Sequence, residues 1–267
     1  MSKSDYKLLS ALGARFHVPE LAESQEALAR WFNTPFGRTL VGFEAEACKQ
    51  ISPRTPGYRA AQLAVSPDCS LMQGFTQQHK FTLTARDQLS GGCVCDFKRL
   101  PLPSDSIDAF LLHHVLDFTP EPHGVLGEVA RTVAPGGHIV VIGFNPYSFF
   151  GMSKWVAGLF SSQQVWRHNS LRKSRVVDWL RLLGFKMLTV QVGGTPTPVT
   201  NLSDRDSSRI VKRATADAFY VLFARKQATP LTPVRHPRWA SAKVHPVPGL
   251  RAVGDNCRRT KRGSNQN

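Results

Sequence analysis

The stretch that decides the fold is Leu100–Phe144, LPLPSDSIDAFLLHHVLDFTPEPHGVLGEVARTVAPGGHIVVIGF. It contains two continuous apolar runs, and these predict strands over Ile107–Leu112 and His138–Phe144. Runs of this kind are typical of parallel strands that are covered on both faces. A helical segment separates them, so the stretch predicts a strand–helix–strand crossover within an α/β fold.

The predicted helix of this crossover has clear end signals. Thr119 can cap its start, Pro120 suits the first helical position, and Glu121 complements the positive end of the helix dipole. The run Pro135-Gly136-Gly137 is expected to stop it. Its apolar stripe consists of Val125, Leu126, Val129 and Val133.

Five short motifs follow one another here, and they are Asp96, Leu100-Pro101, Asp108, His114-Val115-Leu116 and Pro135-Gly136-Gly137. In this order they resemble the class I S-adenosylmethionine (SAM) dependent methyltransferases of the type 11 group. The resemblance extends from about Pro56 to Lys226. It implies a three-layer α/β sandwich with a Rossmann-like, mostly parallel seven-stranded sheet, in which the last strand is antiparallel.

The resemblance also implies SAM as the cofactor. The first strand is expected over 58–65. In the family, a glycine-rich loop follows this strand and approaches the methionine part of SAM. Ala64, Ser66 and Asp68 occupy the glycine positions in this chain. Asp96, followed by Phe97, matches the carboxylate that binds the adenine amino group. With His113, these five residues form the expected cofactor-binding set.

His113 and His114 lie where the predicted fourth strand meets its loop, at the carboxyl edge where open α/β sheets bind ligands. Methyl transfer is an in-line displacement, so the enzyme mainly aligns the acceptor, but an oxygen or nitrogen acceptor can also require a base. His114 and Asp117, three residues later, are therefore the catalytic candidates. The alternative is that the histidines pack against the cofactor or cap the turn.

The 267 residues are 42% hydrophobic and 20% charged, which is typical of a globular protein. No apolar run is as long as a membrane span requires, and Met1–Ser10 lacks the core of a signal peptide, so we expect a cytoplasmic protein. GxGxxG, Walker and GxSxG sequences are also missing, which argues against dinucleotide, nucleoside triphosphate and hydrolase chemistry.

We expect three regions: residues 1–55 as a helical extension, 56–226 as the methyltransferase-like domain and 227–267 as a disordered basic tail. Within the extension, helices are predicted over Ser24–Asn33 and from Thr34-Pro35 to the residue before Ser52. This helix pair is either a lid over the cofactor cleft or plain packing on the sheet.

The remaining elements of the domain are predicted from short apolar runs. Strands are expected over Lys80–Thr84, Cys93–Asp96, Lys186–Val192 and Ala218–Ala224, and a helix over Ser174–Leu183. The apolar segment 145–160 could line a substrate pocket, close as a lid or lie on a membrane surface.

The five cysteines include no CxxC pair, so we interpret them as reduced thiols and expect no metal. Cys93 and Cys95 are expected to share a buried strand face.

The tail carries eight Lys and Arg residues against one Asp, a net charge of +7 out of +15 for the chain. This charge suits RNA or another polyanion, or merely improves solubility.

Two functions follow. The first is a SAM-dependent methyltransferase that acts on a small-molecule acceptor. The second is a methyltransferase-like domain that has lost catalysis and serves as a binding module, with the tail holding RNA or another polyanion. The degenerate glycine loop and the charged tail motivate the second. An active enzyme that uses the tail to recruit an RNA substrate lies between the two.

Overall fold

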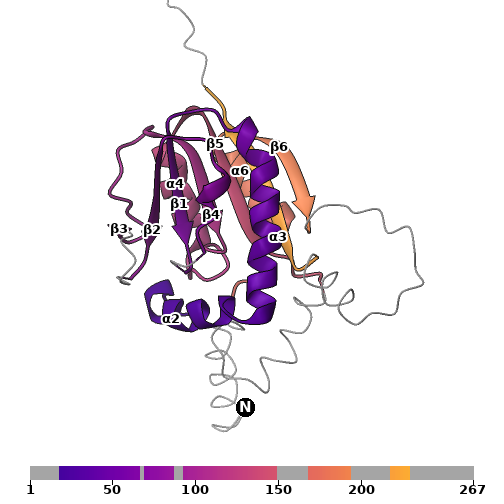
Figure 1. Ribbon diagram of the computed structural model, residues 1–267. Helices are drawn as coiled ribbons and strands as arrows, with labels where there is room; N and C mark the ends of the chain where they lie inside the picture. Colours follow the sequence, from indigo (N-terminus) through magenta and orange to yellow (C-terminus); the bar gives the residue numbers. More distant parts are fainter. Residues whose placement is uncertain (1–17, 67–68, 87–92, 149–167, 194–216, 229–267) are drawn as a thin grey trace, which may run out of the picture. The chain divides into compact units, whose positions relative to one another are not determined.

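The structure is a computed structural model, and it describes residues 18–66, 69–86, 93–148, 168–193 and 217–228 (Figure 1). The strands of these ranges form one seven-stranded sheet in the order β3-β2-β1-β4-β5-β7-β6. Their bounds are β1 Arg59–Ala64, β2 His79–Thr84, β3 Cys93–Val94, β4 Ile107–His113, β5 Val133–Phe144, β6 Phe185–Val192 and β7 Phe219–Lys226.

The sheet is parallel from β3 through β5, and β7 runs antiparallel to both of its neighbours, β5 and β6. The predicted α/β fold with a mostly parallel sheet and an antiparallel last strand is therefore confirmed. The helices of the described ranges are α2 Leu21–Phe32, α3 Pro35–Ile51, α4 Pro122–Thr132 and α6 Lys173–Leu182, with short 3-10 turns η1 Ser52–Arg54 and η2 Met72–Gly74.

The central strands β4 and β5 form the core of the sheet. Phe110, Leu112, Val141 and Ile142 are fully buried, as the continuous apolar runs predicted. β5 begins earlier than expected, at Val133, and a register shift between Ile107 and Ala109 accommodates the extra residues. Pro135-Gly136-Gly137 thus lies inside an irregular strand and does not itself end the helix.

The start of α4 differs from the prediction. Pro122 occupies the first turn and Glu121 the cap position, whereas the prediction placed Thr119 and Pro120 there. The hydroxyl of Thr119 instead donates to the carbonyl oxygen of Val115 at 2.8 Å, so it stabilises the turn after β4. Both Pro120 and Pro122 suit a first helical position, and the local hydrogen bond of Thr119 to Val115 favours Pro122, because it keeps Thr119 in the turn before the helix.

The helix pair α2–α3 has the predicted boundary. The side chain of Thr34 accepts a hydrogen bond from the backbone N–H of Gly37 at 3.2 Å, and Pro35 is the first residue of α3. The aromatic ring of Phe32, at the end of α2, packs against the rings of His113 and His114 at centroid distances of 5.4 and 5.6 Å. In Figure 1, α2 lies beyond the tip of β1. The junction between α2 and α3, where Phe32 lies, therefore covers the carboxyl edge of the sheet.

Among the described cysteines, Cys48 and Cys69 are buried thiols, and none forms a disulfide. The expected burial of Cys93 is wrong, because β3 has only two residues and both are exposed. In the described part of the chain, no helix combines the length and apolar character that crossing a membrane requires. The cytoplasmic location and the three-region division stay predictions, and residues 229–267 lie outside the described ranges.

Candidate functional site

The carboxyl ends of three adjacent strands meet at one edge of the sheet. Ala64 on β1, His113 on β4 and Ile142 on β5 are register partners, so they lie at the same level. Ser66 follows β1 by two residues and is fully buried, and its hydroxyl has no hydrogen-bond partner in the described structure. The structure thus brings together three members of the predicted cofactor-binding set, Ala64, Ser66 and His113.

A buried carboxylate from α3 joins the two histidines. Oε2 of Glu44 lies 2.9 Å from Nε2 of His113, and Oε1 of Glu44 lies 2.7 Å from Nε2 of His114. All three side chains are completely buried. The carboxylate therefore bridges the two rings and uses a different oxygen for each.

His114 is held on its other side by Asp117. Nδ1 of His114 lies 3.0 Å from Oδ2 of Asp117, and the same oxygen accepts the backbone N–H of Phe144 at 2.9 Å. The predicted pair of catalytic candidates is thus in direct contact. Both ring nitrogens of His114 are hydrogen-bonded to carboxylates.

The backbone of His114 is in the left-handed region, with φ at 55°. Residues other than glycine rarely adopt this conformation, and it persists only where the surroundings hold it. Here the backbone N–H of His114 donates to the carbonyl oxygen of Ile142 at 3.0 Å, and the ring is fixed at both nitrogens. Such a strained, fully supported residue is typical of functional sites.

Glu44, His113 and His114 differ in charge at neutral pH, because burial and their mutual contacts shift the pKa of each group differently. Burial alone raises the pKa of the Glu44 carboxyl, but the two histidines and their hydrogen bonds lower it to about 2. Burial alone lowers the pKa of His114, but Glu44 and Asp117 together raise it to about 9. For His113, burial prevails over the attraction of Glu44, and its pKa is lowered. At neutral pH, Glu44 is thus ionised, His114 is an imidazolium and His113 is neutral.

Nδ1 of His113 is buried and has no hydrogen-bond partner in the described part of the chain. Its other nitrogen donates to the ionised Glu44, so Nδ1 carries a lone pair and no proton. Of the four ring nitrogens in the two histidines, only this one is available to a ligand.

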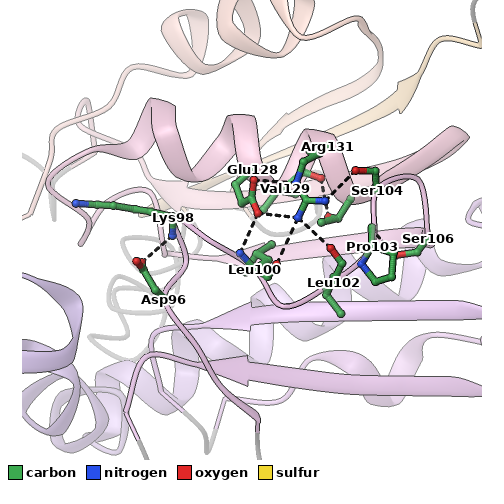
Figure 2. Close-up of polar contacts among 11 residues, drawn as sticks. Asp96, Lys98, Leu100, Leu102, Pro103, Ser104, Ser106, Glu128, Val129 and Arg131 are labelled. Carbon is green, nitrogen blue, oxygen red and sulfur yellow. Dashed lines mark hydrogen bonds and ion pairs between the residues drawn. The ribbon is translucent and has the colours of Figure 1, made fainter.

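Asp96 lies two residues after the short β3 and is exposed. Its Oδ1 accepts the backbone N–H of Lys98 at 2.8 Å (Figure 2). Its other oxygen has no partner among the described residues. Phe97, next to it, is buried. Asp68 of the predicted set lies outside the described residues, as does most of segment 145–160.

The loop after Asp96 is clamped by α4. Glu128 accepts the backbone N–H of Leu100 at 2.9 Å through Oε1, and it binds Arg131 through both oxygens. Arg131 in turn donates to the carbonyl oxygen of Leu102 at 2.9 Å and to the hydroxyl of Ser104 at 2.9 Å (Figure 2). This clamp fixes the segment that leads from Asp96 into β4.

A metal ion is the second ligand to consider. One donor atom from each of Glu44, His113 and His114 lies within 4.8 Å of the others. Two histidines and one carboxylate are a known ligand set for zinc and iron. However, these donors already hydrogen-bond to one another at 2.7 and 2.9 Å.

Sequence reasoning missed Glu44. Helical spacing in the sequence gives α3 an apolar stripe that consists of Leu40, Phe43, Ala47, Cys48 and Ile51. In the structure Glu44 lies on this buried face, while Phe43 is only partly buried. A carboxylate in the middle of an apolar stripe was the available signal, because an acidic residue is rarely buried without a partner.

Comparisons with known proteins bear on this site. Residues 64–141 match the model of a family described as a methyltransferase domain, type 11. This confirms the resemblance to the class I SAM-dependent methyltransferases. A segment of 89 residues is 37% identical to the uncharacterized protein YafS of Escherichia coli K12, and it covers 33% of this chain and 37% of YafS. The chain thus matches about a third of the length of this curated relative.

Several solved structures share the fold. One, from a complex of the Haloferax volcanii Trm112 methyltransferase activator with a methyltransferase, is 14% identical, with a TM-score of 0.57, and the match covers 79% of this chain and 99% of that one. A SAM-dependent methyltransferase from Thermotoga maritima is 18% identical, with a TM-score of 0.55 and coverage of 80% and 100%. At these identities the likeness concerns the fold alone.

Proposed function

We propose, from the premise that residues 64–141 of this chain are a methyltransferase domain, that the protein transfers a methyl group from SAM to a small-molecule acceptor. The observation that carries this proposal is the cluster at the carboxyl edge of the sheet. Ser66, His113 and His114 gather there, inside the matched segment and at the edge where open α/β sheets bind ligands.

The residues present fit SAM at two points. The exposed carboxylate of Asp96 has an oxygen available for the adenine amino group. The buried hydroxyl of Ser66 has no partner in the part of the chain that the structure describes, and a buried polar atom without a partner is costly unless a ligand satisfies it. Ala64 and Ser66 are small, so they replace the family's glycines at a modest steric cost. Asp68 and Phe97 complete the proposed binding set.

When bound, SAM supplies an electrophilic methyl carbon on a positively charged sulfur. The part of the protein is to align the acceptor and exclude water. The rings of Phe32 and Phe144 pack around the histidine pair, with Phe144 4.1 Å from His114 between centroids, and thereby make this environment apolar.

Calorimetric titration with S-adenosylhomocysteine tests the proposal. We expect the wild type to bind and the Asp96→Ala variant to bind roughly 10- to 100-fold more weakly, since a hydrogen bond to a charged group is lost. Asp178→Ala is the matched control, because Asp178 lies on α6 with an exposed side chain and only a long ion pair to Arg181, 3.7 Å. Its affinity should equal that of the wild type.

Two results would contradict the proposal in different ways. Absence of binding by the wild type at millimolar ligand would exclude SAM as the cofactor and favour the alternative of a binding module. Equal affinities of wild type and Asp96→Ala would retain the cofactor but remove Asp96 from its site.

A further inference from the structure

The starting point is Nδ1 of His113, which has no hydrogen-bond partner among the described residues. Its ring is completely buried, and the groups that face it come from three elements: Phe32 on α2, Glu44 on α3, and His114 after β4, with Asp117 contributing at longer range. None of these contacts reaches Nδ1. A buried lone pair without a donor is an unfavourable arrangement that persists where function requires it.

The protons of the cluster can be assigned from its contacts. An ionised carboxylate only accepts, so each Nε2 atom that contacts Glu44 must carry a hydrogen. Nδ1 of His114 must carry one as well, because it faces Asp117. His114 is therefore doubly protonated. His113 carries its single proton at Nε2.

We propose that Glu44 is a positioning residue that fixes His113 as its Nε2–H tautomer, so that Nδ1 of His113 is the base for an acceptor that must lose a proton. This inference rests on the proposed function and specifies its acceptor class, which is a hydroxyl or a protonated amine. His114, although it matches the family's histidine, has no free nitrogen and holds Glu44 in place. The base thus differs from the one that the sequence suggested.

The chemistry balances with this assignment. The carbon–sulfur bond of the methyl donor breaks and its electron pair remains on sulfur. A hydroxyl oxygen forms the new bond to carbon as it loses its proton to Nδ1 of His113. A protonated amine loses its proton to Nδ1 first, which frees the lone pair that forms the new bond. The lowered pKa of His113 keeps that nitrogen unprotonated at neutral pH. In this arrangement the carboxylate of Glu44 orients the ring of His113, and His113 acts as the base toward the acceptor.

A metal ion explains the same residues less well. A cation bound by the two Nε2 atoms and by Glu44 would displace the hydrogen bonds that these atoms already form with one another. It would also leave Nδ1 of His113 without a partner within the described ranges.

Nitrogen-15 NMR of the full chain, labelled at histidine and measured at pH 7 without ligand, tests the inference. In the wild type, His113 should show one protonated nitrogen, Nε2, and His114 should show two. The His113→Gln variant assigns the signals. In Glu44→Gln, a carboxamide cannot accept from both rings, so either His113 must shift its proton to Nδ1 or His114 must lose its positive charge. Glu46→Gln, an exposed position on the same helix, should leave both patterns unchanged.

Three results would overturn the inference: His113 protonated at Nδ1 in the wild type, an unchanged protonation pattern of both rings in Glu44→Gln, or stoichiometric zinc bound to the purified chain by elemental analysis. If Glu44→Gln does not fold, the wild-type spectrum alone decides. The S-adenosylhomocysteine titration on the same sample keeps the two proposals apart. Correct tautomers without cofactor binding would refute the function, and binding with the wrong tautomer would refute only the role of Glu44.

Discussion

At the scale of single residues, the buried contacts of His114 are the most unusual feature. This completely buried histidine departs from ordinary core packing through its positive φ, its positive charge and the carboxylate at each ring nitrogen. Each departure costs stability unless the others compensate for it. The ion pair with Glu44 should therefore contribute to the stability of the fold as well as to its chemistry.

This contribution should depend on pH. The pKa of His114 rises from its ordinary 6.5 to about 9 on folding, so its stabilising effect is complete below pH 6.5 and is lost as the pH rises through 9. The free energy of unfolding of the wild type should fall by up to roughly 3 kcal/mol across this range, as the pKa difference implies. Urea unfolding at pH 6.5, 8 and 9.5 measures it.

Glu44→Gln should flatten that decline, because the charge that raises the pKa of His114 is removed. Glu46→Gln should retain the wild-type slope, since its side chain is exposed. The lowered pKa values of Glu44 and His113 act only on the acid side, below pH 4.5 and 6.5 respectively, and do not affect this window. Equal slopes in wild type and Glu44→Gln would show that the pair does not stabilise the fold.

At the scale of helices and strands, the sequence predicted most elements to within about three residues. The reason is that the apolar runs of β4 and β5 are continuous, and that the Thr34-Pro35 start of α3 is a local signal. Features that depend on distant contacts were not predicted. The role of Glu44 is the clearest case, because it depends on residues 69 and 70 positions away. Local patterns carry no information about such pairs.

The clamp between α4 and the loop after β3 gives a prediction at this scale. Glu128→Gln should lower the free energy of unfolding by about 1 kcal/mol, because a carboxamide cannot accept from Leu100 and from Arg131 at both oxygens. Hydrogen exchange should become faster at the backbone amide of Leu100, which loses its carboxylate acceptor. Glu46→Gln, whose ion pair with Lys49 is long and exposed, should change the unfolding free energy by less than about 0.5 kcal/mol. Equal effects of the two variants would mean that the clamp is not formed.

At the scale of the whole molecule, charge is divided between two regions. Residues 227–267 carry +7 and the remaining 226 residues carry +8. The last described contacts before the tail are firm, because Nζ of Lys226 donates to the carbonyl oxygens of Ala130 and Val133, and the N–H of Gln227 donates to Gly184. The domain therefore has the contacts to close its sheet without the residues that follow Ala228.

Removal of residues 229–267 should leave the thermal midpoint of the domain unchanged. If the tail recruits a polyanion, the same truncation should abolish binding to polyuridylic acid, and the binding of the full chain should weaken steeply with salt as released counterions require. Fluorescence anisotropy with labelled polyuridylic acid at two salt concentrations measures this. Binding that survives truncation would place the polyanion site on the domain.

The bridge between Glu44 and the histidines also has an evolutionary consequence. Glu44 lies on α3, outside the segment 64–141 that matches the family, whereas both histidines lie inside it. Two regions of the gene must therefore change together. Relatives that replace His113 are released from the need for an acid in α3, and relatives that keep His113 should retain that acid. A comparison of relatives over the matched segment 64–141 alone would not separate those that have an acid at the position of Glu44 from those that lack it. Only the former would keep His113 oriented as a base.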